Sequence, residues 1–583
     1  MRQFFKTLLA AFLGTLIALG TCFFLLIGMI AAFSASETVT VPTSAILKLD
    51  FSDPIEEQGR DEIVNFSSMD LAGTNSIGIL KVLNSIQAAA EDPAIKFIYL
   101  NPGEMNIGMA QLEEIRDAFV RFRQCGKPII AYCDNYSQAG YYLCSVADKI
   151  YMNREGMGGM VGLSANIMFF KNILDKIGIN VQLIRHGKFK SAAEQFVQQD
   201  ISNANRLQNQ EMLNSVWSSW TEAICQSRGI DPDEFNRWVD NLQLTLPSTW
   251  VEKGLVDKIV TRGEMTDILC NLSSVDSEKE LMFVSVRRYA EARLTENYRI
   301  RDKVAVIYAD GEITMDGTEG IAANRFYPII KKVTDDSSVK AVVLRVNSPG
   351  GDAQAADIIN EALQDLREEK PLIVSFANYA ASGGYWIAAQ SDHIFTDETT
   401  ITGSIGVFSL FMTYGDALKK QLDINTVNIS TNSHSDMLLG MRKLDNVETA
   451  AMQDMVENVY GKFINLVSDG RNINVAQVDS IGQGRVWTGS QALLINLADS
   501  KGGILDAIEY AKSAAGLDEA RVVEYPAPKN QLDKIMEMLN GSASAAKIVT
   551  DPVSAVEKAY SYLKGQKNSF TTLARLPYIY EIE

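Results

Sequence analysis

Apolar and polar residues alternate along most of the chain in two recurring patterns. Residues 304–309, 341–346 and 372–376 are continuous runs rich in apolar and β-branched residues, whereas residues 353–367 place apolar positions at helical spacing. Short continuous apolar runs are typical of strands buried on both faces, and their alternation with helices is typical of parallel sheets joined by crossover helices. The pattern predicts an α/β fold.

The same pattern of motifs occurs twice in the sequence. Residues 140–143 (GYYL) match residues 384–387 (GYWI), and residues 159–162 match residues 403–406 at the same shift along the chain. A shift that stays constant over several motifs indicates an internal duplication.

The duplication and the length together predict the domain organisation. A single hydrophobic core stops growing at roughly 250–300 residues, so a chain of 583 residues needs more than one. We predict tandem α/β domains over residues 36–295 and 296–529, divided near the charged segment 287–303 and followed by a partly helical tail, residues 530–583.

The N-terminus carries an uncharged apolar stretch, residues 8–33, preceded by Arg2 and Lys6. As a helix at ~1.5 Å per residue it reaches about 39 Å, which is enough for a ~30 Å bilayer core. Because basic flanks stay in the cytoplasm, we predict that residues 1–35 form a single-pass anchor in the inner (plasma) membrane, with the other domains outside the cytoplasm, in the periplasm. A cleaved signal peptide is the alternative, although its apolar region is usually only ~7–15 residues long.

Charge and cysteine content narrow the classes of function. A net charge of -18 disfavours nucleic acid as a partner, because phosphate binding needs a basic patch. The six cysteines all lie in the first half without a Cys-x-x-Cys pair, so neither a disulfide framework nor a zinc site is predicted. The glycine-rich segment 156–162 lacks the Lys-Ser/Thr ending of a phosphate loop and is interpreted as a structural turn. No metal or cofactor is expected.

The two halves differ in chemistry at two aligned positions. Ser382 stands where the first half has Gln138, and Lys190 stands where the second half has Ser435. One half therefore keeps a hydroxyl and the other keeps an amine. Because a serine hydroxyl is a weak nucleophile without a base, we interpret Ser382 and Lys190 as one catalytic pair supplied by both halves.

The identity of the base has alternatives. Lys188 lies two residues from Lys190 and on the same side of an extended segment, so spacing alone does not separate them. A lysine base must be neutral near pH 7, which requires burial to lower its pKa by ~3 from ~10.4. A Ser-His-Asp triad is disfavoured, because the three histidines lie in cationic, polar or surface surroundings: His186, His393 and His434.

Glycine-rich turns accompany the candidate nucleophile. Ser382 follows a buried strand and opens a helix, where free backbone N–H groups and the helix dipole favour negative charge. A second turn, which contains Gly350 and Gly351, ends another buried strand, and its N–H groups would complete an oxyanion hole with that of Gly383. The alternative is that both are ordinary strand-to-helix turns.

These motifs resemble those of the signal peptide peptidase SppA (protease IV) family in its long, duplicated form. The resemblance covers nearly the whole chain and is carried by residues 347–351, 381–386, 402–407 and 189–194. Asp352 departs from the family pattern, in which a more neutral residue is expected, and leaves the substrate preference at that edge open.

The resemblance implies a crotonase-like (Clp-protease-like) fold for each half and serine endopeptidase activity with a Ser/Lys dyad. It makes Ser382 the nucleophile and Lys190, rather than Lys188, the base, with Ser404 near the lysine. It also implies a membrane-tethered homotetramer that degrades leftover signal peptides. The oxyanion donors would come from Gly350, Gly351 and Gly383.

Two other functions are compatible with the motifs. A crotonase-type acyl-CoA lyase or hydrolase shares glycine-rich oxyanion turns, but an extracytoplasmic location disfavours it, because CoA chemistry is cytosolic. A non-catalytic membrane scaffold with vestigial turns is the second alternative, since one half already lacks the serine.

Overall fold

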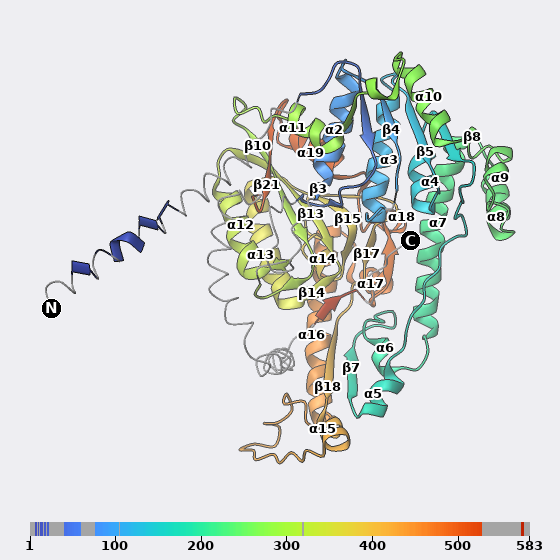
Figure 1. Ribbon diagram of the computed structural model, residues 1–583. Helices are drawn as coiled ribbons and strands as arrows, with labels where there is room; N and C mark the ends of the chain where they lie inside the picture. The colour runs from blue at the N-terminus through green and yellow to red at the C-terminus, as the bar shows by residue number, and fades with distance from the viewer. Residues whose placement is uncertain are drawn as a thin grey trace.

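The computed structural model describes residues 40–59, 76–103, 105–317, 320–527 and 573–576, together with scattered positions between 6 and 21. The predicted membrane anchor lies largely outside these residues. Over the part of the chain that is described, no helix combines the length and the apolar character needed to cross a membrane. Two α/β units lie side by side, and an arm extends from them (Figure 1).

The first unit is built on a six-stranded parallel sheet in the order β8-β6-β5-β4-β1-β9. Its strands are β1 (Ala45–Leu49), β4 (Ile95–Leu100), β5 (Ile129–Cys133), β6 (Lys149–Asn153), β8 (Lys258–Val260) and β9 (Phe283–Ser285). Its main helices are α2 (Ile79–Glu91), α3 (Met109–Arg123), α4 (Gln138–Cys144), α10 (Arg262–Ser273) and α11 (Val286–Arg293). Because the central strands are apolar on both faces, helices cover both sides of the sheet.

The second unit repeats this plan around the order β19-β17-β15-β13-β10-β21, with β16 between β15 and β20. Among the described strands of this sheet, only β17 and β19 pair antiparallel. Its strands are β10 (Lys303–Asp310), β13 (Val339–Ser348), β15 (Leu372–Ala381), β16 (His393–Thr396), β17 (Ile401–Gly403), β19 (Val486–Thr488), β20 (Ser500–Lys501) and β21 (Arg521–Tyr525). Its helices include α12 (Ala323–Asp335), α13 (Ala353–Glu369), α14 (Gly383–Trp386), α18 (Gly489–Leu494) and α19 (Ile504–Ala514). The predicted α/β alternation is confirmed.

The internal duplication is also visible in the element order. Strands β1, β4, β5 and β6 of the first sheet occupy the same places as β10, β13, β15 and β16 of the second. Each half then contributes a helix of 26 residues, α7 (Asn203–Arg228) and α16 (Asn446–Arg471). Matching lengths and matching order confirm that one unit occurs twice.

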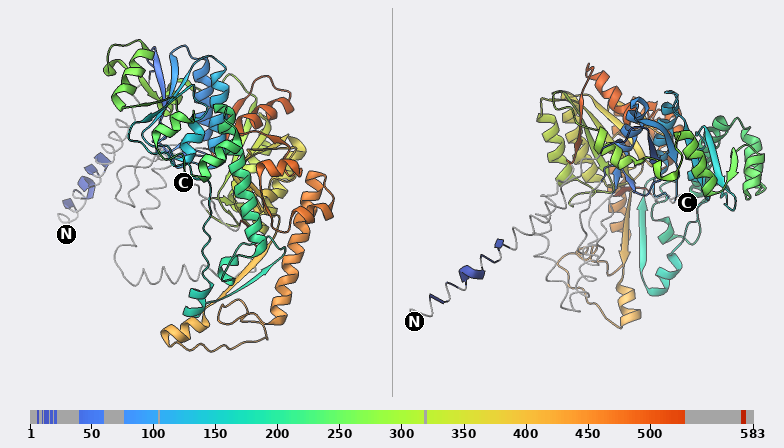
Figure 2. Two further views of the ribbon diagram at one scale, coloured as in Figure 1. Left: turned by 90° about the vertical axis from the view of Figure 1, so that its right-hand side faces the viewer. Right: turned by 45° about the horizontal axis from the view of Figure 1, so that its top comes forward.

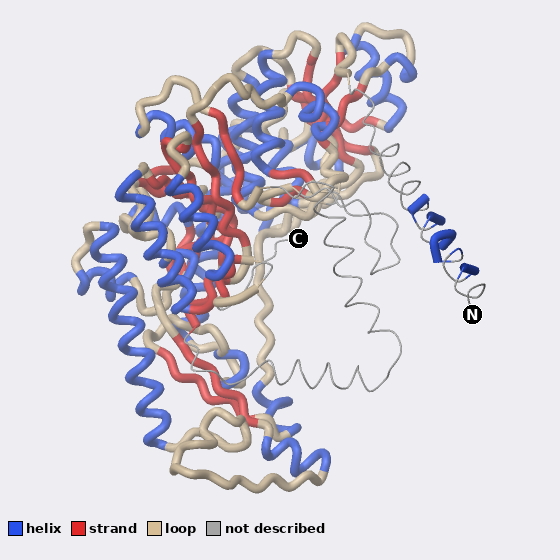
Figure 3. Tube along the Cα trace, turned by 90° about the vertical axis from the view of Figure 1, so that its left-hand side faces the viewer, coloured by secondary structure: helices blue, strands red, loops and turns tan. Residues whose placement is uncertain are grey.

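A third sheet, in the order β12-β11-β14-β22-β18-β7, crosses the division between the halves. Strand β7 (Asn180–Arg185) comes from the first half and pairs antiparallel with β18 (Phe408–Thr413) of the second. These two strands extend away from the two units and form the arm, which is visible in both views of Figure 2. In the sequence, α5 (Lys171–Ile177) precedes β7 and α15 (Gly415–Leu422) follows β18. Helix α16 packs along both strands (Figure 3). The segment 36–295 therefore contributes a strand to the other half.

The same sheet contains a piece of the tail. Strand β22 (Leu573–Arg575) pairs antiparallel with β14 (Gly350–Asp352), which follows β13 directly. The remaining strands are β11 (Ile313–Thr314) and β12 (Ile321–Ala322), and the pair β2 (Ile55–Glu56) and β3 (Ile77–Gly78) forms a separate small sheet. The predicted partly helical tail, residues 530–583, lies outside the described residues except for 573–576.

A buried ion cluster joins the two units. The guanidinium of Arg345, on β13, lies 2.7 Å from a carboxylate oxygen of Glu57 and also contacts Glu114, on α3. It donates further hydrogen bonds to Ser375 Oγ (2.8 Å) and Phe376 O (3.0 Å). Burial alone would lower the pKa of Arg345, but Glu114 and Glu57 outweigh it, while burial raises the pKa of Glu114. Two carboxylates of one unit therefore depend on one cation of the other.

Helix α3 of the first unit is a further point of attachment to the second unit. The side chain of Asn378, on β15, accepts a hydrogen bond from the backbone N–H of Ala110 (3.0 Å) at the start of α3. On the same helix, Glu113 accepts from the backbone N–H groups of Glu398 and Thr399, both at 3.1 Å. Burial raises the pKa of Glu113 to about 7. Polar groups with fixed geometry thus set the position of one half against the other.

We expect Arg345→Met to destabilise the protein by about 3–5 kcal/mol, because the substitution leaves two buried carboxylates without their cation. The measurement is the midpoint of urea unfolding followed by circular dichroism. Arg367→Met is the matched control: Arg367 pairs with Asp392 at 2.7 Å, but both side chains are more than a third exposed, so its loss should change stability by less than about 1 kcal/mol. Equal unfolding midpoints for the two variants would contradict the stabilising role that we assign to Arg345.

Candidate active site

Ser382 lies at the turn between β15 and α14 and is fully buried. Its backbone has φ 58° and ψ −115°, a conformation that non-glycine residues seldom adopt and that costs roughly 1–3 kcal/mol. The backbone N–H of Ser382 donates to Gly403 O on β17 (2.8 Å), which holds the turn. The sharp turn places the hydroxyl at the carboxyl end of the second sheet.

Lys190 reaches this hydroxyl from the other half of the chain. It lies between β7 and α6 (Glu194–Val197), and its side chain is fully buried. Its Nζ is 2.7 Å from Ser382 Oγ, 3.0 Å from Ser404 Oγ and 3.1 Å from Ser404 O. Ser404 follows β17, so three segments that are distant in sequence meet at one amine.

The backbone of the lysine segment is held by one contact with the second half and by one within the first half. The N–H of Phe189 donates to Gln483 O (3.0 Å), and Arg185 Nη1 donates to Lys190 O (2.7 Å). Gly484, with φ +78°, lies so close that a Cβ on it would be 2.5 Å from Lys190 Cβ. Only glycine permits this approach, which encloses the stem of the lysine.

Burial lowers the pKa of Lys190 well below its ordinary value of 10.5. The hydrogen-bond partners of its Nζ are uncharged hydroxyl and carbonyl oxygens, so they do not restore the charged form. Lys188 is exposed, with its Nζ 5.1 Å from the ring centre of Phe189. Burial therefore distinguishes two lysines that spacing alone left equivalent.

The two glycine-rich turns lie against each other. A Cβ on Gly350, which has φ +100°, would be 2.8 Å from Gly383 N, and a Cβ on Gly383 would be 3.2 Å from Gly351 N. The N–H of Gly350 already donates to Ser348 Oγ (3.2 Å). This leaves the N–H groups of Gly351 and Gly383 as the pair suited to a developing oxyanion.

Asp352, the residue that departs from the family pattern, has a local task. Its side chain accepts a hydrogen bond from Ala355 N (2.9 Å) and caps the N-terminus of α13. Capping of this kind satisfies one of the free N–H groups at the start of a helix. The carboxylate of Asp352 thus stabilises the N-terminus of α13, the helix that follows β14.

The equivalent site in the first half is closed by a side chain. Gln138 stands in place of the serine, and its Oε1 accepts hydrogen bonds from Val161 N (3.0 Å) and Gly162 N (2.8 Å), while its Nε2 donates to Gly162 O (3.1 Å). The counterpart of the lysine, Ser435, is exposed and donates to Asn432 O (3.1 Å). Neither a nucleophile nor a base remains at these two described positions.

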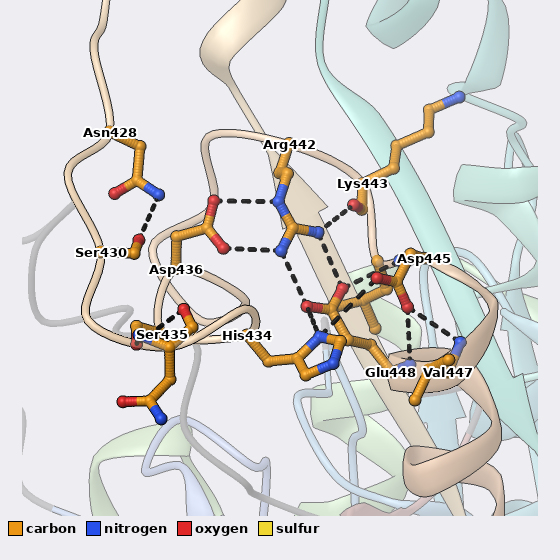
Figure 4. A network of polar contacts seen from close by, with 12 residues as sticks. Asn428, Ser430, His434, Ser435, Asp436, Arg442, Lys443, Asp445, Val447 and Glu448 are labelled. Atoms are coloured by element: carbon orange, nitrogen blue, oxygen red, sulfur yellow. Dashed lines mark hydrogen bonds and ion pairs between the residues drawn. The ribbon is translucent and has the colours of Figure 1, made fainter.

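The loop that carries Ser435 also brings together the ligand-type side chains of His434, Asp445 and Glu448, whose ligand atoms lie within 4.8 Å of one another. Arg442 occupies the same network and donates to Asp436 (2.6 Å) and Glu448 (2.7 Å) (Figure 4). The arginine holds the pKa of Glu448 down at about 2. This cluster is therefore an ion-pair network that shapes the arm.

The histidines have partners other than the candidate serine. His186 contacts Glu457 (2.6 Å), His393 contacts Ser500 (2.9 Å) and His434 contacts Glu448 (3.0 Å). The structure thus gives no support to a Ser-His-Asp triad. The described cysteines are all free thiols: Cys125, Cys133, Cys144, Cys225 and Cys270.

One positioning residue was missed by sequence analysis. Gln208, on α7, donates to Phe189 O (3.1 Å) and Ser191 Oγ (2.8 Å), on either side of Lys190, and accepts from Val486 N (3.3 Å) on β19. It ties the lysine segment to the second sheet. Its only signal in the sequence is a polar residue on a helix face, which is too common to single out.

A duplicated α/β fold with a buried serine beside a buried amine is the arrangement of a serine peptidase. Residues 121–276 and 364–518 match Peptidase family S49, once in each half. "Protease 4" of Haemophilus influenzae is 34% identical over 508 residues, 84% of this chain and 82% of the relative. "Protease 4" of Salmonella typhi is 32% identical over 82% of this chain and 78% of the relative. The chain belongs to peptidase family S49, in its long, duplicated form, and is a serine endopeptidase.

Family membership excludes the acyl-CoA enzyme and the non-catalytic scaffold as interpretations of the motifs. Among solved structures, a ClpP1 mutant from Listeria monocytogenes is similar at 12% identity with a TM-score of 0.25, over 35% of this chain and 94% of that chain. A score this low does not establish a shared fold. The crotonase-like (Clp-protease-like) form of each unit stays a prediction.

We expect Lys190→Met to stabilise the protein at neutral pH. Folding lowers the pKa of Lys190, so between this lowered pKa and ~10.4 the unfolded chain binds more protons, and wild-type stability rises with pH across that window. Methionine removes the penalty, about 1.4 kcal/mol for each pKa unit of lowering. The measurement is the thermal unfolding midpoint between pH 6 and 10.

The matched control for this measurement is Lys188→Met, which alters an exposed lysine two residues away and should leave the midpoint unchanged. A Lys190→Met protein that is less stable than wild type at pH 7 would show that the buried amine is charged.

Proposed function

We propose that the enzyme hydrolyses peptide bonds with Ser382 as the nucleophile and Lys190 as the general base. The observation that carries the proposal is the 2.7 Å separation of Lys190 Nζ from Ser382 Oγ, with both side chains fully buried. The neutral amine takes the hydroxyl proton as Oγ attacks the peptide carbonyl, and the resulting ammonium then protonates the leaving amine. Water then attacks the acyl-enzyme while the neutral amine of Lys190 takes a proton from it, and the resulting ammonium returns the proton to Ser382 Oγ as that oxygen leaves.

The backbone amides of Gly351 and Gly383 hold the oxyanion in this proposal, and the left-handed conformation of Gly350 brings their two turns together. Ser404 has a supporting role. Its hydroxyl and carbonyl oxygens lie 3.0 and 3.1 Å from Lys190 Nζ, so they accept two amine hydrogens and direct the lone pair toward Ser382. No metal or cofactor enters these steps.

We further propose that the substrates are apolar peptides, such as cleaved signal peptides, and that the enzyme works on the extracytoplasmic side of the inner membrane. The uncharged stretch 8–33 with its basic flank supports an anchor with a cytoplasmic N-terminus. The resemblance to the signal peptide peptidase SppA family supports a membrane-tethered homotetramer and this class of substrate.

We expect Ser382→Ala and Lys190→Ala each to lower kcat by about 10³-fold or more, because each removes a group that the other needs. Lys188→Ala should retain wild-type kcat, since its side chain is exposed. The measurement is cleavage of a fluorogenic peptide by the purified full-length proteins. Wild-type activity in Lys190→Ala would end the assignment of the base.

The pH dependence of the acylation rate should follow the titration of Lys190. Because the neutral amine is the active form and burial lowers its pKa, labelling of Ser382 by a fluorophosphonate should accelerate with pH and level off well below ~10.4. The rate of labelling is followed by mass spectrometry between pH 5 and 10. A midpoint near the ordinary lysine value would contradict a base in a dry environment.

A further inference from the structure

A short turn of the second half, residues 482–485, packs against the segment that carries Lys190. The turn directly precedes β19. A Cβ on Gly187 would collide with Gln483 O, and a Cβ on Gly484 would be 2.5 Å from that of Lys190. Both glycines have positive φ, +91° and +78°, so glycine is needed on each side of the contact. The two stretches of backbone touch, and the turn therefore helps to decide where the amine lies.

Arg485 ends this turn, and its side chain stacks on aromatic rings from both halves of the chain. Its Cζ lies 4.0 Å from the ring centre of Trp487, on β19, and 5.2 Å from that of Phe189, the residue before Lys190. A guanidinium within about 6 Å of an aromatic ring is attracted to the face of the ring, and its planar shape lets it stack there. Arg485 therefore connects the second sheet to the lysine segment.

The same guanidinium is anchored to a helix of the first half. Its Nη2 contacts the carboxylate of Glu211, on α7, the helix that also carries Gln208. The side chain of Arg485 is only 21% exposed. The carboxylate fixes the direction of the guanidinium, so that ion pairing and ring stacking hold it in one orientation.

The backbone of the turn supports a second neighbour of the amine. Arg485 O accepts a hydrogen bond from Ser404 N (2.7 Å), and the N–H of Gly484 donates to Ile405 O (2.7 Å). Ser404 is the residue whose hydroxyl and carbonyl oxygens lie beside Lys190 Nζ. The turn thus contacts both the stem of the lysine and the residue that receives its hydrogen bonds.

We propose that Arg485 is a positioning residue, which keeps the lysine segment closed against the second half and so keeps water away from the amine of Lys190. The inference rests on the proposed function, in which that amine is the base. Within the described part of the chain, the hydrogen-bond partners of Nζ are oxygens of Ser382 and Ser404. Arg485 therefore acts on the chemistry only through the segment that it holds.

The other ionisable groups around the segment have partners of their own or are exposed. These groups are Arg185 (bound to Lys190 O), His186 (to Glu457), Lys188 (exposed), Glu194 (to Asn205), Glu211 (to Arg485) and Tyr460 (to Asp479). Since Nζ has uncharged partners, exclusion of water is what lowers the pKa of Lys190. A residue that maintains this exclusion controls how much of the amine is neutral.

The first test uses the full-length Arg485→Lys variant, which keeps the charge but loses the planar group that stacks on both rings. Water that enters a loosened segment raises the pKa of Lys190, so the pH midpoint of fluorophosphonate labelling should rise by about one unit or more. Labelling at pH 7 should then slow about tenfold for each unit, whereas the rate on the high-pH plateau should equal that of wild type. An unchanged midpoint, or a rate lowered equally at every pH, would overturn the proposal.

Arg521→Lys is the matched control for this test. Arg521 stacks on Tyr298 at 5.0 Å and pairs with Glu296 at 3.4 Å, and its side chain is 19% exposed. It lies on β21, at the opposite edge of the second sheet from β19. The same interactions are altered there without contact to the lysine segment, so this variant should keep the labelling profile of wild type.

The second test needs no catalysis and therefore separates this inference from the proposed chemistry. Hydrogen exchange of a peptic fragment that covers residues 187–192 is followed by mass spectrometry in Ser382→Ala, with and without Arg485→Lys. The N–H of Phe189 donates to Gln483 O, so loosening of the segment should accelerate its exchange by about tenfold or more. Arg521→Lys in the same background should leave this exchange unchanged. Equal exchange with and without Arg485→Lys would overturn the positioning role, whatever the role of Lys190.

Discussion

A single lysine amine kept out of water by two halves of one chain is the constraint on which the active site depends. Lys190 is fully buried, and burial lowers its pKa. Any separation of the units would admit water, return the amine to its charged form and remove the capacity to act as a base that we propose for it. The buried contacts of Arg345 with Glu57 and Glu114, and the pairing of β7 with β18, therefore help to keep the proposed base buried.

The interface between the two halves combines rigid polar geometry with apolar packing. Helix α3 is capped by Asn378 from the other half, and Gln208 holds the backbone on both sides of Lys190. Directional hydrogen bonds of this kind fix the relative position of two units more closely than apolar contact alone. They allow a strained serine turn and a desolvated amine to stay within hydrogen-bond distance without a charge pair between them.

Comparison of the two halves in sequence was enough to predict the main residues of the candidate site. The serine and the lysine were predicted as a pair because each half lacks the group that the other half has, a difference that is visible without coordinates. The α/β alternation was equally accessible, since apolar periodicity reports burial. The choice between Lys188 and Lys190 required either the family resemblance or the observed burial.

The parts that sequence could not supply are pairings between remote segments. Strand β7 leaves its own half to join β18, and the short strand β22 has too few residues to show a period. The position of Gln208 likewise depends on where α7 lies against β19. Local pattern reports which face of an element is buried, but it does not name the partner that buries it.

The division of the proposed pair between the two copies also has an evolutionary consequence. Gln138 ties down the turn that corresponds to the turn of Ser382, and Ser435 lies exposed at the surface. If Ser382 and Lys190 act as the proposed pair, a gene shortened to a single copy would encode either the nucleophile or the base, but not both. Selection would then act on the two copies as one indivisible unit.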